Sequence, residues 1–179
     1  MSDKIVIRNS YSHRVSTVKK SNGHSILRII AYIMARKLEN NLTGNEHNFS
    51  HKSGVINTGF FMPHVKTEMN EEQFYNHIEN NSHASTNIIG YSSILALPPE
   101  LSQEEQIKVV EKFCEDFTEQ YGTCISYAIH EADNLKRKKA RLEEIEKYNL
   151  PEDKEDLQLQ IQNNHVHFVI PYCKIKALT

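Results

Sequence analysis

Cysteines are few in this sequence, and long apolar runs are missing from it. The three cysteines in 179 residues are odd in number and show no CxxC spacing, which is typical of a protein that stays reduced in the cytosol. No apolar run is long enough to span a membrane, and residues 1–10 alternate in polarity, unlike a secretory signal peptide. We therefore expect a cytoplasmic protein without membrane insertion. Its length fits one domain, residues 1–179, that buries its own core.

An overall excess of charge is also lacking, because the formal net charge is only −2. The charges are nevertheless segregated: residues 1–37 carry +7, with Asp3 as their one acid, and the remainder carries −9. A basic segment on an acidic protein is expected of a phosphate binder. The alternative is a solvated basic edge without a ligand. The eight basic residues are Lys4, Arg8, Arg14, Lys19, Lys20, Arg28, Arg36 and Lys37.

The order of predicted elements indicates an α+β fold. Six apolar side chains at helical spacing predict an amphipathic helix over residues 26–38. A capping box from Ser102 to Glu105 and a closing glycine delimit a second helix, 102–122. The pattern predicts strands at 4–11, 54–63, 88–98, 124–130 and 163–172, and helices at 70–81, 134–149 and 152–162. Strands with helices on one side predict a two-layer sandwich around a mainly antiparallel sheet.

The closing strand carries two histidines on one face. In "NNHVHFVIPY", residues 163–172, the apolar Val166, Phe168 and Ile170 alternate with His165 and His167. Because strand side chains alternate between faces, the two imidazoles point away from the core face and can converge on one point. Two interpretations follow from this stretch alone. One is a half-exposed strand that carries two histidines, and the other is a metal-binding pair.

A third histidine occupies an equivalent position in another predicted strand. In "CISYAIH", His130 ends the strand on the face opposite Ile125, Tyr127 and Ile129. If this strand neighbours the closing strand, His130 joins the pair in a three-imidazole cluster. Neutral imidazole is a good ligand for divalent transition ions. His130 alone is compatible with an ordinary residue at a strand end, so its assignment as a metal ligand depends on the other two histidines.

A candidate nucleophile lies on the helix predicted over 26–38. Tyr32 has Arg28 one turn before it and Arg36 one turn after it. Flanking guanidinium groups favour the phenolate and also bind phosphate oxygens. The alternative is an interfacial tyrosine between ordinary surface arginines. The basic segment around Tyr32 favours the nucleophile.

Five segments of the chain form an ordered set that covers nearly its whole length. They are "SILRIIAYIMARKL", "FSHKSGVINTGFFMP", "ALPPELSQEEQ", "AIH" and "NNHVHF". In these segments and their order the chain resembles the MobA/MobL family of relaxases, HUH-type endonucleases that initiate the transfer of conjugative or mobilised plasmids. The resemblance implies a five-stranded antiparallel sheet with helices packed on it. It also implies that Tyr32 is the nucleophile and that His130, His165 and His167 bind a divalent metal ion.

The function implied by the resemblance is strand-specific DNA nicking at a plasmid transfer origin. Tyr32 would form a 5′-phosphotyrosyl link, with Mn²⁺ or Mg²⁺ in the site and Zn²⁺, Ni²⁺ or Co²⁺ as alternatives. Single-stranded DNA and other relaxosome proteins are the expected partners. The expected DNA-binding residues are Arg14, Lys19, Lys20, Arg28 and Arg36. Two other functions remain open: a rolling-circle replication initiator or transposase of the same fold, and a metal- and DNA-binding remnant without cleavage activity.

Three departures from the family pattern stand out. Ser92 and Ser93 occupy a strand on which relatives often carry acids, so no general base is assigned. The closing strand continues into "PYC", 171–173, where relatives have a Thr-Thr-Arg-like segment. The 34 residues between His130 and His165 exceed the family spacing. This insert, about 131–162, is expected to form a charged helical hairpin, with a DNA clamp as the alternative. Residues 1–179 are also compatible with the N-terminal part of a longer relaxase.

Overall fold

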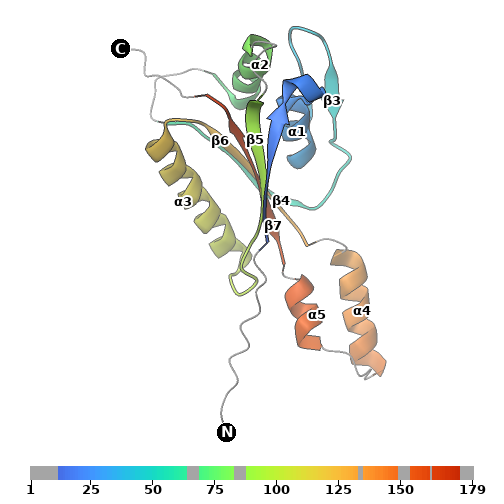
Figure 1. Ribbon diagram of the computed structural model, residues 1–179. Coiled ribbons are helices and arrows are strands. Elements are labelled where there is room, and N and C mark those ends of the chain that lie inside the picture. Colours follow the sequence, from blue (N-terminus) through green and yellow to red (C-terminus); the bar gives the residue numbers. More distant parts are fainter. Residues whose placement is uncertain are drawn as a thin grey trace.

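A five-stranded antiparallel sheet forms the centre of the protein in a computed structural model (Figure 1). The structure describes residues 12–63, 69–82, 88–132, 135–148, 154–161 and 163–173. The strand order across the sheet is β1-β5-β7-β6-β4, and every neighbouring pair is antiparallel. The strand expected at 4–11 lies outside the described residues. The five strands are β1 (His13–Lys19), β4 (Val55–Phe61), β5 (Ile88–Ala96), β6 (Ile125–His130) and β7 (His165–Pro171).

Helices cover both faces of this sheet. Helices α1 (Ile26–Ile33) and α2 (Glu71–Asn81) pack on one face, and α3 (Gln103–Tyr121) packs on the other (Figure 1). The predicted α+β class and antiparallel sheet are confirmed, but the layering is helix–sheet–helix, not two layers. The reason lies in β6, whose two faces are both buried up to Ile129 and therefore need a cover on each side.

Helix α1 is shorter than its apolar spacing predicts. It begins after the N-cap Ser25 and ends at Ile33, and Ala35 then turns the chain with a φ of 49°. The chain continues into β2 (Lys37–Glu39), which pairs with β3 (Glu46–Asn48) in a small separate sheet. Leu38 is buried as a strand residue. An apolar side chain at that position satisfies a helix or a strand equally well, and the pairing with β3 decides between them.

The signals predicted at the two ends of α3 are confirmed. Helix α3 has a reciprocal capping box between Ser102 and Glu105, and Gly122 closes it in the left-handed conformation with a φ of 64°. Helix α2 begins with a capping box between Asn70 and Gln73. A short 3₁₀ helix, η1 (Lys20–Asn22), links β1 to the segment before α1.

The insert between β6 and β7 forms a helical hairpin. Helices α4 (Leu135–Tyr148) and α5 (Lys154–Ile161) contact each other and project beyond the ends of β6 and β7 (Figure 1). Both helices fall within the ranges expected from the sequence. Figure 1 shows the hairpin on the same side of the sheet as α1.

Membrane-spanning helices are absent from the described part of the chain, where each helix is too short or too polar to cross a bilayer.

Candidate functional site

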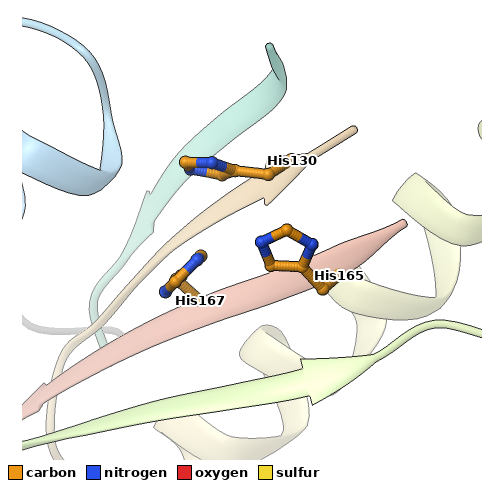
Figure 2. A group of neighbouring side chains, drawn as sticks. All are labelled: His130, His165 and His167. Carbon is orange, nitrogen blue, oxygen red and sulfur yellow. The ribbon is translucent and has the colours of Figure 1, made fainter. Parts of the chain in front are cut away.

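Three imidazoles meet on the sheet face that α1 covers. Strands β6 and β7 are neighbours, and their register places His130 directly opposite His165 and Ala128 opposite His167. Figure 2 shows the three side chains pointing toward one another. The ring centroid of His130 lies 5.4 Å from that of His165 and 4.7 Å from that of His167. The centroids of His165 and His167 are 5.1 Å apart. The cluster predicted from strand alternation therefore forms, and we call it the histidine triad.

The triad fits a divalent metal ion. One nitrogen from each ring lies within 4.8 Å of the others. A tetrahedral zinc ion bound to nitrogen at 2.0–2.1 Å holds its ligands about 3.4 Å apart, so small rotations of the rings bring all three into range. Imidazole ligands leave the full charge of the ion available to a substrate.

His167 is held in the form that binds metals. Burial, followed by the neighbouring His130, His165 and Lys52, lowers its pKa from 6.5 to about 3. The ring is therefore neutral at physiological pH, and a neutral imidazole has the lone pair that a metal ion needs.

His130 is oriented by the end of helix α1. Its Nε2 lies 2.6 Å from the carbonyl oxygen of Ile33, the last residue of that helix. A carbonyl only accepts hydrogen bonds, so Nε2 carries the proton and Nδ1 keeps the lone pair in the neutral ring. Backbone contacts of this kind fix the tautomer and the orientation of metal-binding histidines. This bond also connects the triad to the helix that carries Tyr32.

Tyr32 lies in the last turn of α1 with its side chain 49% exposed. Phe49 packs edge-on against its ring at a centroid distance of 5.3 Å. The ammonium group of Lys52 lies 3.1 Å from the ring centroid and donates a hydrogen bond of 3.3 Å to the Tyr32 carbonyl oxygen. Lys52 was not identified from the sequence. The one available signal was its place as the only cation in the quoted segment "FSHKSGVINTGFFMP".

A cleft of about 900 Å³ joins these groups. Tyr32, Lys52 and the whole triad line it. Glu131 is the one carboxylate among the described residues of its lining, and sequence reasoning did not single it out either. No signal in the sequence separated Glu131 from the other acids of the insert. Ser92 and Ser93 supply no acid on β5. The first turn of α4 completes the lining with Lys136, Arg137 and Lys138.

Two of the five expected DNA-binding residues lie beside this cleft. Arg28 lines an adjoining groove of about 340 Å³ together with Tyr32 and His167. Arg14 pairs across the sheet with Ile94, which in turn pairs with His167. Residues paired in this way project from the same face. Arg14 is therefore exposed on the triad side of the edge strand β1.

The other three expected DNA-binding residues lie elsewhere. Lys19 is five residues beyond Arg14, roughly 16 Å further along the strand. Lys20 donates hydrogen bonds to the carbonyl oxygens of Glu79 and Ser82 at the end of α2, at 2.9 and 3.0 Å. Lysine is favourable there because it complements the negative end of the helix dipole.

Arg36 does not flank Tyr32 on the helix as the spacing predicted, because α1 ends before it. Its guanidinium forms a salt bridge with Glu71, which also accepts a hydrogen bond from the buried Ser126 of β6. Arg36 thus joins the end of α1 to the start of α2 and to the sheet.

Comparisons with known proteins agree with this fold. The MobA/MobL family profile matches residues 24–177. A curated relative, "Mobilization protein MobL" of Acidithiobacillus ferridurans, is 20% identical over 169 residues, which cover 93% of this chain and 43% of the relative. The chain thus spans less than half the length of that relative.

A solved structure shares the fold at 15% sequence identity. Its title is "Molecular Basis of Vancomycin Resistance Transfer in Staphylococcus aureus", and the two superpose with a TM-score of 0.69 over 93% of this chain and 72% of the other. At this level of identity the match concerns the fold alone. Since the family profile covers most of the sequence, this chain belongs to the MobA/MobL family.

Proposed function

We propose that this chain is a DNA relaxase that nicks one DNA strand and stays attached to it through Tyr32. The observation that carries the proposal is the cleft in which Tyr32 meets the histidine triad in a member of the MobA/MobL family. A nucleophile and a metal site within one cleft are the two parts of a metal-assisted transesterification of a phosphodiester.

The residues of the cleft would act on the scissile phosphate in turn. A divalent ion bound by the triad, Mn²⁺ or Mg²⁺ with Zn²⁺, Ni²⁺ or Co²⁺ as alternatives, would polarise a non-bridging oxygen. Tyr32 attacks phosphorus, so its Oη–P bond forms as the P–O3′ bond breaks. The phenol loses its proton and the departing 3′-oxygen gains one. The products are a 5′-phosphotyrosyl end and a 3′-hydroxyl, and the reverse reaction rejoins the strand without a nucleotide cofactor.

Lys52 and Phe49 would position the nucleophile. Their contacts hold the Tyr32 ring from two sides, which reduces the entropy lost when the phenol is aligned for attack. The ammonium group of Lys52 also lies where it attracts a phosphate to the cleft.

The proposed substrate is single-stranded DNA at a plasmid transfer origin, bound in the cytoplasm together with other relaxosome proteins. The name of the curated relative supports a role in mobilisation. Arg14 and Arg28 border the site and are the proposed backbone contacts. A rolling-circle initiator would use the same chemistry at another origin, and a remnant would bind DNA without cutting it.

A covalent-capture experiment tests this proposal without knowledge of the origin. Wild-type protein is incubated with Mn²⁺ and a single-stranded library that carries 40 randomised nucleotides. We expect an adduct that survives denaturing electrophoresis, and sequencing of the attached DNA identifies the preferred site. Tyr32→Phe should abolish the adduct while single-stranded DNA binding stays within a few-fold.

The matched control is Tyr121→Phe, because Tyr121 is 52% exposed and lies on α3, across the sheet from the triad. This variant should form the adduct normally. If the wild type forms no adduct, both cleaving functions are excluded, and the remnant without cleavage activity is the function that stands. Peptide mapping that finds the DNA on Tyr11, which lies outside the described residues, would replace Tyr32 as the nucleophile without changing the reaction.

A further inference from the structure

The basic start of helix α4 lies at the candidate site, although it belongs to an insert. The chain leaves the sheet at His130 and returns at His165, and these two residues face each other in the register. Helix α4 begins only five residues after His130. The insert is therefore rooted at the triad, and its first helical turn, Lys136, Arg137 and Lys138, lines the cleft together with Tyr32.

The charge of the cleft contrasts with that of the chain. Among the described lining residues are four cations, Lys52 and the three basic residues of the α4 turn, against the single carboxylate of Glu131. The chain as a whole carries a net charge of −2. A concave surface lined by one sign of charge concentrates its potential and attracts an oppositely charged ligand.

The charge order along α4 is the reverse of what helix stability favours. Acids stabilise the start of a helix and cations its end, because of the helix dipole. Helix α4 has no acid in its first turn and carries five of its six basic residues in its first half. Acids outnumber the one remaining cation, Lys147, in the second half. The first-half basic residues are Lys136, Arg137, Lys138, Lys139 and Arg141, and the acids are Glu143, Glu144 and Glu146.

This arrangement is unfavourable for an isolated hairpin, and the position of the basic turn indicates a role outside the helix. The turn faces the cleft, on the side of the sheet that also holds α1 (Figure 1). A polyanion in the cleft would turn the unfavourable charge order into a favourable one, because its phosphates would supply the negative charge that the start of the helix lacks.

We propose that the first turn of α4 forms one wall of a single-stranded DNA channel and binds the backbone phosphates that flank the scissile one. This inference rests on the proposed relaxase function and assigns the hairpin as its substrate clamp. Contacts of this kind are independent of sequence and strongly dependent on salt. We assign single-stranded DNA as the ligand of this cleft, because Tyr32, the proposed nucleophile, belongs to the same lining.

The test compares two variants of equal charge in the full-length chain. The clamp variant is Lys136→Gln/Arg137→Gln/Lys138→Gln. The control variant is Lys139→Gln/Lys147→Gln/Lys154→Gln, which removes three cations of the same hairpin from outside the cleft lining. The probe is fluorescein-labelled (dT)30, and its anisotropy is measured from 50 to 300 mM NaCl.

We expect the clamp variant to bind at least tenfold more weakly at 100 mM NaCl. The slope of log K against log salt should fall by about two units, since each phosphate contact contributes about 0.7 for a single strand. The control variant should stay within twofold of the wild type. Its slope should change by less than half a unit.

Folding is monitored by circular dichroism, and the melting temperature of the clamp variant should equal or exceed that of the control because the dipole conflict is removed. If the clamp variant melts at a lower temperature than the control, the double variant Lys136→Gln/Arg137→Gln decides, since both side chains are exposed. Its salt slope should fall by about 1.4 units. If the double variant and the control show equal salt slopes while the wild type still forms the Tyr32 adduct, the clamp proposal is overturned and the relaxase proposal stands. Failure of the wild type to bind (dT)30 or to form the adduct overturns the relaxase proposal and the clamp with it.

Discussion

At the scale of single residues, the three imidazoles of the triad are held by different surroundings. His130 is fixed by the carbonyl oxygen of Ile33, and His167 is kept neutral by burial, with its pKa lowered to about 3. His165 is the first residue of β7, where the chain returns from the insert, and it pairs directly with His130. The rings thus project from two neighbouring strands, and the contact at His130 is of the kind that preorganises metal-binding histidines.

Loss of one imidazole should weaken metal binding. His165→Ala leaves two nitrogen ligands, and disturbance of a metal site commonly reduces affinity by about 10–100-fold. Isothermal titration calorimetry with MnCl₂ should show at least a tenfold increase in Kd. The control is His77→Ala, because His77 is exposed on α2 and bonds only within its own helix among the contacts described. Unchanged affinity in His165→Ala would remove the triad as the metal site.

At the scale of elements, α1 is held at both ends. Ser25 caps its start, and the Glu79 carboxylate of α2 accepts hydrogen bonds from the Ser25 hydroxyl and the Leu27 amide, at 2.9 and 3.1 Å. Ile33 meets His130 at the other end. The position of Tyr32 relative to the triad therefore depends on this helix as a unit. Arg28 lies on the helix and Arg36 lies beyond its end, so the two arginines have different environments.

Arg28 and Arg36 should respond differently to alanine. Arg28→Ala removes an exposed cation beside the cleft, so the salt slope of (dT)30 binding should fall by about 0.7 with little change in stability. Arg36→Ala leaves Glu71 without its cation. It should lower the free energy of unfolding by about 1–3 kcal/mol, because Arg36 is 37% exposed and solvent screens part of the pair. Urea denaturation and anisotropy titrations measure both. Equal effects of the two substitutions on both quantities would contradict these assignments.

The hairpin of α4 and α5 should be dispensable for folding but not for DNA affinity. Its helices contact each other and make few contacts with the rest of the described chain. Replacement of residues 134–162 by a short Gly/Ser loop should leave a protein that melts cooperatively and binds Mn²⁺ as the wild type does. Insolubility, or melting without cooperativity, would show that the hairpin is part of the core; Ile145, fully buried in α4, would then be the first residue to examine.

At the scale of the whole molecule, two apolar clusters enclose the sheet and the triad lies where the cover is incomplete. One cluster packs beneath α1 and α2, and the other beneath α3. Tyr75 of α2 is fully buried in the first cluster, and its hydroxyl donates to the carbonyl oxygen of Val169 on β7. The packing that places the histidine strand is thus coupled to the stability of the core.

This coupling predicts a loss of stability at alkaline pH. Burial is the first cause that raises the pKa of Tyr75 well above 10. The unfolded chain releases this proton near pH 10 and the folded protein retains it, so stability falls as the pH rises above about 10. The contribution of one group is at most about 1.4 kcal/mol per pH unit. Urea denaturation at pH 8 and pH 11 should show a smaller loss in Tyr75→Phe than in the wild type; equal losses would contradict the assignment.

Local periodicity determined which residues share a face, and this much followed from the sequence alone. The alternation in β6 and β7 placed three histidines opposite the apolar residues, and the structure keeps that division. The capping box of α3 and the charged helices of the insert were also predicted, because each depends on residues within a few positions of one another.

Only the tertiary structure decided which of these faces meet. The register that sets His130 against His165, the contact of Lys52 with Tyr32 and the salt bridge of Arg36 with Glu71 join residues that are far apart in the chain. The early end of α1, before Arg36, and the second helical layer also result from contacts between residues that are far apart in the chain. Such contacts depend on the path of the chain and on competition between alternative partners, and local spacing carries no information about either.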